Sequence, residues 1–188
     1  MMAITKKRKA DDRMTSQTKL SGSRLLVMTA LFAALACAAT MVLVVPSPSG
    51  GYMNLGDAVV LLGAYLLGPL WGAVAGGVGA ALADLMAGYA MYVPATLCIK
   101  ALMALLAGGL YRLLRTRKWA LPVCGAAGEA VMVVGYWLYD GFLLGSLAGS
   151  AAGIPANLMQ AAFGLAASSL LAAALRKSAY VRREFPHL

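Results

Sequence analysis

Six long apolar stretches fill most of this chain, and they constrain its fold more than any other feature. They cover residues 25–45, 57–70, 71–88, 94–112, 120–139 and 154–175. A helix needs about 20 apolar residues to cross a hydrocarbon core of about 30 Å, so six spans fit, although the second is short. With 61% hydrophobic and 12% charged residues, the chain is too apolar to cover the surface of a water-soluble domain. The sequence therefore predicts an all-α integral membrane protein with six transmembrane helices.

The basic residues predict the orientation of these helices. All of the 16 Lys and Arg residues except Lys100 lie before the first stretch, at residues 112–118, or after the last stretch. Residues 57–88 could form one bent span, but Gly68 and Pro69 interrupt the run with a turn signal. Counting two spans there puts all three basic clusters on one side, and the positive-inside rule then places both termini in the cytoplasm. The net charge of +9 is thus an orientation signal, and we expect no nucleic-acid partner.

Three regions follow from this topology. Residues 1–23 are polar, basic and without periodicity, which is typical of a disordered cytoplasmic tail. Residues 24–176 form the six-helix transmembrane domain, and residues 177–188 form a cytoplasmic C-terminal tail. The three cysteines lack CxxC spacing and His187 is the only histidine, so we expect no metal site, no cofactor and no enzyme that depends on histidine.

Five ionisable residues lie within or at the ends of the apolar stretches: Asp57, Asp84, Lys100, Glu129 and Asp140. Each costs roughly 2.5–3.5 kcal/mol at the bilayer centre and needs a partner, water or a ligand. Asp57 and Asp140 are predicted at the external helix ends, where water reaches them. Asp84 and Lys100 are predicted at similar depth on neighbouring helices, where they could form a structural salt bridge or contact a ligand. Glu129 is predicted near the midplane.

Helical spacing indicates which way these groups point. Gly72, Gly76, Ala80 and Asp84 recur every four residues, so Asp84 continues a stripe of small residues that would pack against another helix. The same spacing groups Thr96 with Lys100, Glu129 with Tyr136 and Asp140, and Asn157 with Gln160. We expect these faces to converge on one internal cavity.

Polar and aromatic residues that gather toward the external end are the candidate substrate-binding set. They are Tyr52, Asn54, Asp57, Asp84, Tyr89, Tyr92, Lys100, Tyr136, Asp140, Asn157 and Gln160. An aromatic belt at the membrane interface accounts for some of the tyrosines, but it does not need carboxylates and amides on inward faces. Carboxylates, amides and aromatic rings around a concavity suit a small, polar, ring-containing solute. The Pro- and Gly-rich segment 46–56 is either a lid over this cavity or an ordinary connection.

The first apolar stretch carries a row of alanines. Ala30, Ala34 and Ala38 recur every four residues and form a flat face on which another helix can dock. That face either packs within the bundle or binds a separate membrane subunit. The chain has no Walker motif, so it is not expected to hydrolyse ATP itself.

Several motifs resemble the substrate-binding (S) component of energy-coupling factor (ECF) transporters. They are GGYMNLGD at 50–57, GPLWGAVAGGVG at 68–79, ADLMAGY at 83–89 and YVPAT at 92–96 with Lys100. The most similar group is the one assigned to riboflavin, pyridoxine or hydroxymethylpyrimidine-type solutes.

The resemblance implies a membrane-embedded component that captures a vitamin or vitamin precursor from outside, under the loop between the first two helices. It implies a transmembrane coupling subunit and two cytoplasmic ATPase subunits as partners, with release of the solute after the S component topples in the cell membrane. Carried onto this chain, the loop positions are Tyr52, Asn54 and Asp57, and the docking positions are Ala30 and Ala34. Two alternatives remain open: a stand-alone ion-coupled transporter, with Glu129 and Asp84 as proton carriers, and a membrane-embedded enzyme or assembly factor.

Overall fold

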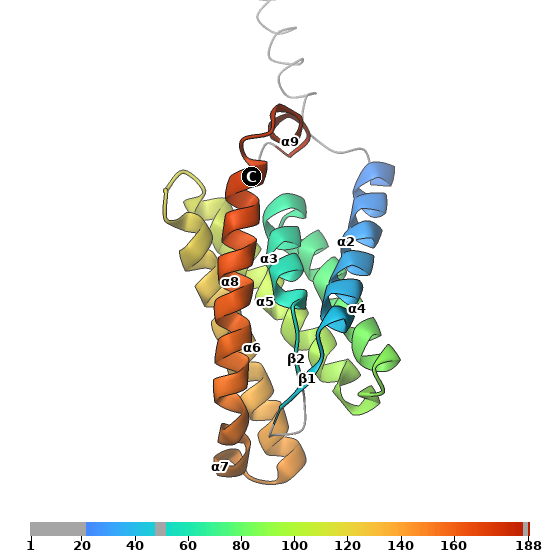
Figure 1. The fold of residues 1–188 in the computed structure, drawn as a ribbon. Coiled ribbons are helices and arrows are strands. Elements are labelled where there is room, and N and C mark those ends of the chain that lie inside the picture. The colour runs from blue at the N-terminus through green and yellow to red at the C-terminus, as the bar shows by residue number, and fades with distance from the viewer. Residues whose placement is uncertain (1–21, 48–51, 186–187) are drawn as a thin grey trace, which may run out of the picture.

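The helices follow the apolar stretches of the sequence. The computed structural model describes residues 22–47, 52–185 and 188, and its long helices form one bundle (Figure 1). They are α2 (Gly22–Val42), α3 (Gly56–Leu67), α4 (Pro69–Met86), α5 (Val93–Leu114), α6 (Ala120–Leu144) and α8 (Ile154–Leu175). Shorter elements are η1 (Ala90–Tyr92), α7 (Leu147–Ser150), η2 (Ala151–Gly153) and α9 (Ala179–Glu184). Except for residues 22 and 23, the basic tail expected at 1–23 lies outside the described residues.

The break between α3 and α4 confirms that residues 57–88 form two helices. Gly68 has φ 87°, a left-handed conformation that glycine adopts without steric cost. Pro69 follows as the first residue of α4, where a missing backbone N–H costs nothing. A side chain at position 68 would also collide with the guanidinium of Arg112.

Five helical segments are long and apolar enough to cross a membrane, and α3 is a shorter apolar helix. With 12 residues, α3 is about 18 Å long at 1.5 Å per residue, which is well short of a bilayer core of about 30 Å. All residues of α3 except Val59 are buried. It is therefore a central element of the bundle, surrounded by the longer helices.

A small hairpin continues from α3 toward the end of the bundle that carries α7 (Figure 1). Strands β1 (Val45–Pro46) and β2 (Tyr52–Met53) pair antiparallel, with Val45 opposite Met53. Because α3 is short, this hairpin and Asn54 occupy space that a full-length helix would fill. Of the described residues in the predicted loop 46–56, Asn54 and Gly56 are buried, so the part that leads into α3 lies in the bundle's interior.

The stripe of small residues on α4 packs against a helix, as predicted. A Cβ at Gly72 would lie 2.8 Å from the backbone nitrogen of Ala64, and one at Gly76 would lie 2.7 Å from Val60. Such distances leave no room for a side chain, so these glycines let α4 lie directly on α3. The main apolar core is built around α3 and includes Leu61.

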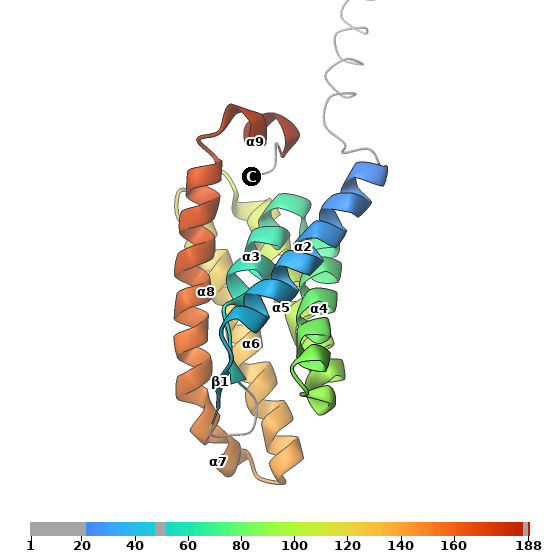
Figure 2. The same ribbon diagram turned by 45° about the vertical axis from the view of Figure 1, so that its right-hand side comes forward.

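The start of α2, the 115–119 turn and the chain's C-terminus lie at one end of the bundle, the upper end in Figures 1 and 2. Arg24 forms an ion pair of 3.0 Å with Glu184 of α9, and Arg176 donates a hydrogen bond to the hydroxyl of Tyr111. The segment 177–188, expected as a tail, thus contains the helix α9, and Phe185 packs against the core. The hairpin and α7 lie toward the opposite end (Figure 2).

Candidate functional site

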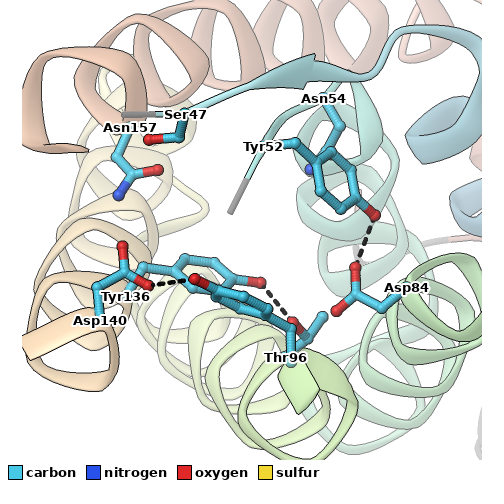
Figure 3. Close-up of a pocket in the computed structure, with 9 residues that line it drawn as sticks. Ser47, Tyr52, Asn54, Asp84, Thr96, Tyr136, Asp140 and Asn157 are labelled. Carbon is cyan, nitrogen blue, oxygen red and sulfur yellow. Dashed lines mark hydrogen bonds between the residues drawn. The ribbon is translucent and has the colours of Figure 1, made fainter. Parts of the chain in front are cut away.

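A polar pocket lies beside the hairpin, away from the basic end of the bundle. Its walls come from the hairpin segment, α4, η1, α5, α6 and α8 (Figure 3). The lining residues are Ser47, Tyr52, Asn54, Asp84, Tyr92, Thr96, Tyr136, Asp140 and Asn157. The inward faces of four helices and the loop therefore meet at one site, as the helical spacing predicts.

Hydroxyl groups cap the two carboxylates of the pocket. The Tyr52 hydroxyl donates to Asp84 Oδ1 at 2.6 Å, and the Tyr92 hydroxyl donates to Asp140 Oδ1 at 2.9 Å. Figure 3 shows a third contact of 2.9 Å, between the hydroxyls of Thr96 and Tyr136. Burial is the main reason why the pKa of Tyr52 lies far above its usual range, and the hydrogen bond to Asp84 raises this pKa further. Tyr52 therefore stays protonated at neutral pH and remains a donor to Asp84.

The pocket is narrow in this conformation. Its cavity has a volume of about 20 Å³, which is enough for about one water molecule. A ring-containing solute is many times larger, so it can enter only if the side chains around the cavity move apart. Tyr52 belongs to the hairpin and contacts Asp84 on α4, so this hydrogen bond is one of the contacts that hold the hairpin against the opposite wall.

A buried polar network lies next to the pocket and holds the hairpin in place. The Lys100 ammonium of α5 forms an ion pair with Asp57 Oδ1, and Gln160 Nε2 of α8 donates to Asp57 Oδ2 at 2.6 Å. The backbone N–H of Asn54 donates to Gln160 Oε1 at 2.8 Å, and the Asn54 side chain accepts from the N–H of Gly56 at 2.9 Å. Three helices and the hairpin are thus joined through polar groups that water does not reach.

This network rules out one of the two alternatives for Asp84 and Lys100, a salt bridge between them. Helices α4 and α5 are neighbours, but Asp84 turns to Tyr52 and the Lys100 ammonium bonds to Asp57. Asp57 and Asp140 were expected at water-exposed helix ends, and they are 1% and 2% exposed. Asp57 is buried because its carboxylate faces Lys100 of α5 and Gln160 of α8. Asp140 is buried because α6 continues past it to Leu144 and the Tyr92 hydroxyl lies on its carboxylate.

Glu129 of α6 lies behind the pocket and does not line it. It is 3% exposed, and neither of its carboxylate oxygens has a hydrogen-bond partner among the residues that the structure describes. A Cβ at Gly164 on α8 would overlap Glu129 Oε1, so the absent side chain at position 164 makes room for this carboxylate. Within residues 22–47, 52–185 and 188, no group of three His, Cys, Asp or Glu side chains is placed to hold a metal ion.

The predicted binding residues divide into three groups in the structure. Those that line the pocket are Tyr52, Asn54, Asp84, Tyr92, Tyr136, Asp140 and Asn157. Asp57, Lys100 and Gln160 form the adjoining network, and the ring of Tyr89 packs on Tyr52 with 4.6 Å between centroids. Thr96 and Ser47 also line the pocket and were absent from the predicted set. The four-residue spacing from Lys100 signals Thr96, whereas nothing in the sequence singles out Ser47.

The alanine row of α2 faces outward. Ala30, Ala34 and Ala38 are exposed, whereas Ala36 is buried with Thr29 and Thr40 on the opposite face of the same helix. The bundle therefore does not use this row for its own packing.

Two comparisons with known proteins place the chain. The model of the family "ECF-type riboflavin transporter, S component" matches residues 21–177. A protein of Pyrococcus woesei, described as "Uncharacterized protein in gap 3'region", is 36% identical over 140 residues, which cover 73% of this chain and 92% of that protein.

Proposed function

Because the chain belongs to the family of S components of ECF-type riboflavin transporters, we propose that its polar pocket captures a small ring-containing vitamin or vitamin precursor from outside. Membership makes the chain a substrate-binding transport component of the cell membrane and not an enzyme. It also implies a small vitamin substrate and the partners of an ECF module. The observation that carries the proposal is the narrow pocket of carboxylates, amides and aromatic rings beside the hairpin.

In this proposal the chain crosses the membrane six times, with the short α3 enclosed by the five longer helices, and both termini are cytoplasmic. Support comes from the clustering of the described basic residues other than Lys100 at one end of the bundle, where Arg24 and Arg176 make their contacts. The positive-inside rule assigns that end to the cytoplasm. The hairpin and the pocket then open toward the external side, from which an S component takes its substrate.

The hairpin acts as the lid in this proposal. The cavity of about 20 Å³ requires opening before a ring can enter, and the Tyr52–Asp84 hydrogen bond is the contact that would break. After the solute binds, the hairpin closes over it again and shields the solute from water.

Energy for import comes from separate subunits in this proposal. The exposed row at Ala30 and Ala34 would dock on a transmembrane coupling subunit that carries two cytoplasmic ATPase subunits. Replacing both alanines with tryptophan should abolish ATP-dependent uptake into proteoliposomes, while substrate affinity stays unchanged. Ala162 and Ala166 on α8 have the same spacing and are also exposed, so their double tryptophan variant is the matched control and should retain uptake.

Binding is tested with the purified chain in nanodiscs. Mass spectrometry of co-purified small molecules identifies the solute, and calorimetry with riboflavin, pyridoxine and hydroxymethylpyrimidine ranks the candidate rings. We expect one of these solutes to bind without any other subunit. If the chain alone accumulates solute in liposomes under an ion gradient without ATPase subunits, it is a secondary transporter and the proposed coupling is wrong.

A further inference from the structure

Acidic side chains line the wall of the pocket. Its lining residues, all within the described part of the chain, include Asp84 and Asp140 and no Lys, Arg or His. In the sequence, Lys100 is the only base between Arg24 and Arg112, and no base occurs between Lys118 and Arg176. The Lys100 ammonium bonds to Asp57 in the adjoining network, so it acts on Asp84 only through space.

One of these carboxylates also has an unused acceptor that points into the pocket. Asp84 is 4% exposed, and its Oδ1 accepts from Tyr52 (Figure 3). Its Oδ2 is buried and has no hydrogen-bond partner among the described residues. A buried carboxylate oxygen without a donor is costly, and a donor that carries positive charge compensates it best.

Aromatic rings complete the surroundings of these carboxylates. Tyr136 lines the pocket, and the rings of Tyr52 and Tyr89 pack 4.6 Å apart at its edge. The rings of Tyr92 and Tyr139 are 5.5 Å apart near Asp140. The face of a tyrosine ring attracts an organic cation, and it also stacks on a flat heterocycle.

We propose that the pocket selects a ring-containing solute that carries positive charge, on a protonated amine or a heteroaromatic nitrogen, and that an N–H group of this solute donates to Asp84 Oδ2. Phosphorylated or carboxylated forms of the same ring are rejected, because Asp84 and Asp140 would repel them. This inference rests on the proposed binding function and adds the charge of the substrate to it.

The test uses one ring with three charges. Calorimetry with the purified chain in nanodiscs compares pyridoxamine, whose side-chain amine is cationic, with pyridoxine and pyridoxine 5′-phosphate. Charged hydrogen bonds are roughly twice as strong as neutral ones, so we expect pyridoxamine to bind at least about tenfold more tightly than pyridoxine, and the phosphate to bind more weakly than either. Thiamine, riboflavin and flavin mononucleotide extend the comparison to larger rings with positive, neutral and negative charge.

The possible outcomes distinguish failure of the charge inference from failure of the proposed binding function. Tightest binding of a neutral or phosphorylated member would overturn the charge inference and leave the binding function standing. If no member of the panel binds, both proposals fall. A preference for the cation in each ring series supports both.

Two isosteric variants test whether the carboxylates set this preference. Asp84→Asn and Asp140→Asn each remove one acid from the wall and should lower the preference for pyridoxamine over pyridoxine by about tenfold. Glu129→Gln is the matched control, since it alters a buried acid that does not line the pocket, and it should keep the preference. Elution as a single species by size exclusion shows which variants fold. An unchanged preference in both folded aspartate variants would overturn the inference.

Discussion

The ion pair between Lys100 and Asp57 is expected to contribute strongly to stability when only one partner is removed. Their side chains are 2% and 1% exposed, so water cannot replace a lost partner. In Lys100→Met, Asp57 would keep the 2.6 Å hydrogen bond from Gln160 but lose its positively charged partner. Leaving one buried charge unpaired typically costs about 3–5 kcal/mol, and we expect a loss of that size in the free energy of unfolding.

A double-mutant cycle tests this reasoning. Asp57→Asn keeps an oxygen that can accept from Gln160 and removes the charge that Lys100 balances. The double variant Asp57→Asn/Lys100→Met should therefore be more stable than the sum of the two single losses by about 2 kcal/mol or more. Unfolding is measured by titrating sodium dodecyl sulfate into mixed micelles and following the fluorescence of the three tryptophans.

The control for this cycle is Lys118→Met, the same replacement at an exposed lysine in the turn between α5 and α6. It should leave the unfolding transition in place. If Lys100→Met unfolds like the unmodified chain, the Lys100 ammonium does not stabilise the folded protein through Asp57. If the double variant loses the sum of the two single changes, the residues are not coupled, and either result would refute the reasoning.

Two further predictions concern close packing and the lid. The Cβ that Gly164→Ala adds would lie 2.8 Å from the Cβ of Asp57, so this variant should lower the free energy of unfolding by about 1–3 kcal/mol. Gly109→Ala is the control, because a Cβ there meets nothing within 4 Å, and it should not lower the melting temperature. Equal melting temperatures in the two variants would contradict the close contact. Tyr52→Phe removes the 2.6 Å hydrogen bond to Asp84, which is worth about 1.5–3 kcal/mol for a charged acceptor, so solute association in stopped flow should accelerate about tenfold. Tyr139→Phe, whose hydroxyl donates to the backbone of Met91, should not change the association rate, and equal rates in the two variants would show that Tyr52 does not hold the lid.

Sequence reasoning predicts the helices of this protein well because each has a local signal. The apolar stretch 154–175 coincides with α8, and the Gly68-Pro69 turn divides α3 from α4. The inward direction of Asp84 also follows from local spacing, since the small residues of its row must face another helix. These predictions need only the period of one helix and the chemistry of one turn.

The pairing of the charged residues could not be predicted in the same way. Depth in the membrane was counted from expected loop boundaries, which placed Asp57 at a wet helix end and Asp84 beside Lys100. The error comes from α3, whose 12 residues begin inside the bundle. No periodicity signals that a helix begins at depth, because an apolar run of this length has the same composition in either position.

The short α3 also explains why this chain tolerates several buried charges. A full-length helix would fill the centre of the bundle with apolar side chains, whereas the hairpin brings backbone N–H groups and Asn54 to that depth. Gln160 Oε1 accepts from the Asn54 N–H and Asn54 Oδ1 accepts from the Gly56 N–H, while Asp57 accepts from the Gln160 amide and so holds it in position. Once Asp57 is buried for this purpose, Lys100 is required to balance it, and Asp84 and Asp140 are left to the pocket wall. The position of the hairpin inside the bundle and the acidic pocket thus both follow from the short length of α3. Lengthening α3 by an apolar insertion should remove both.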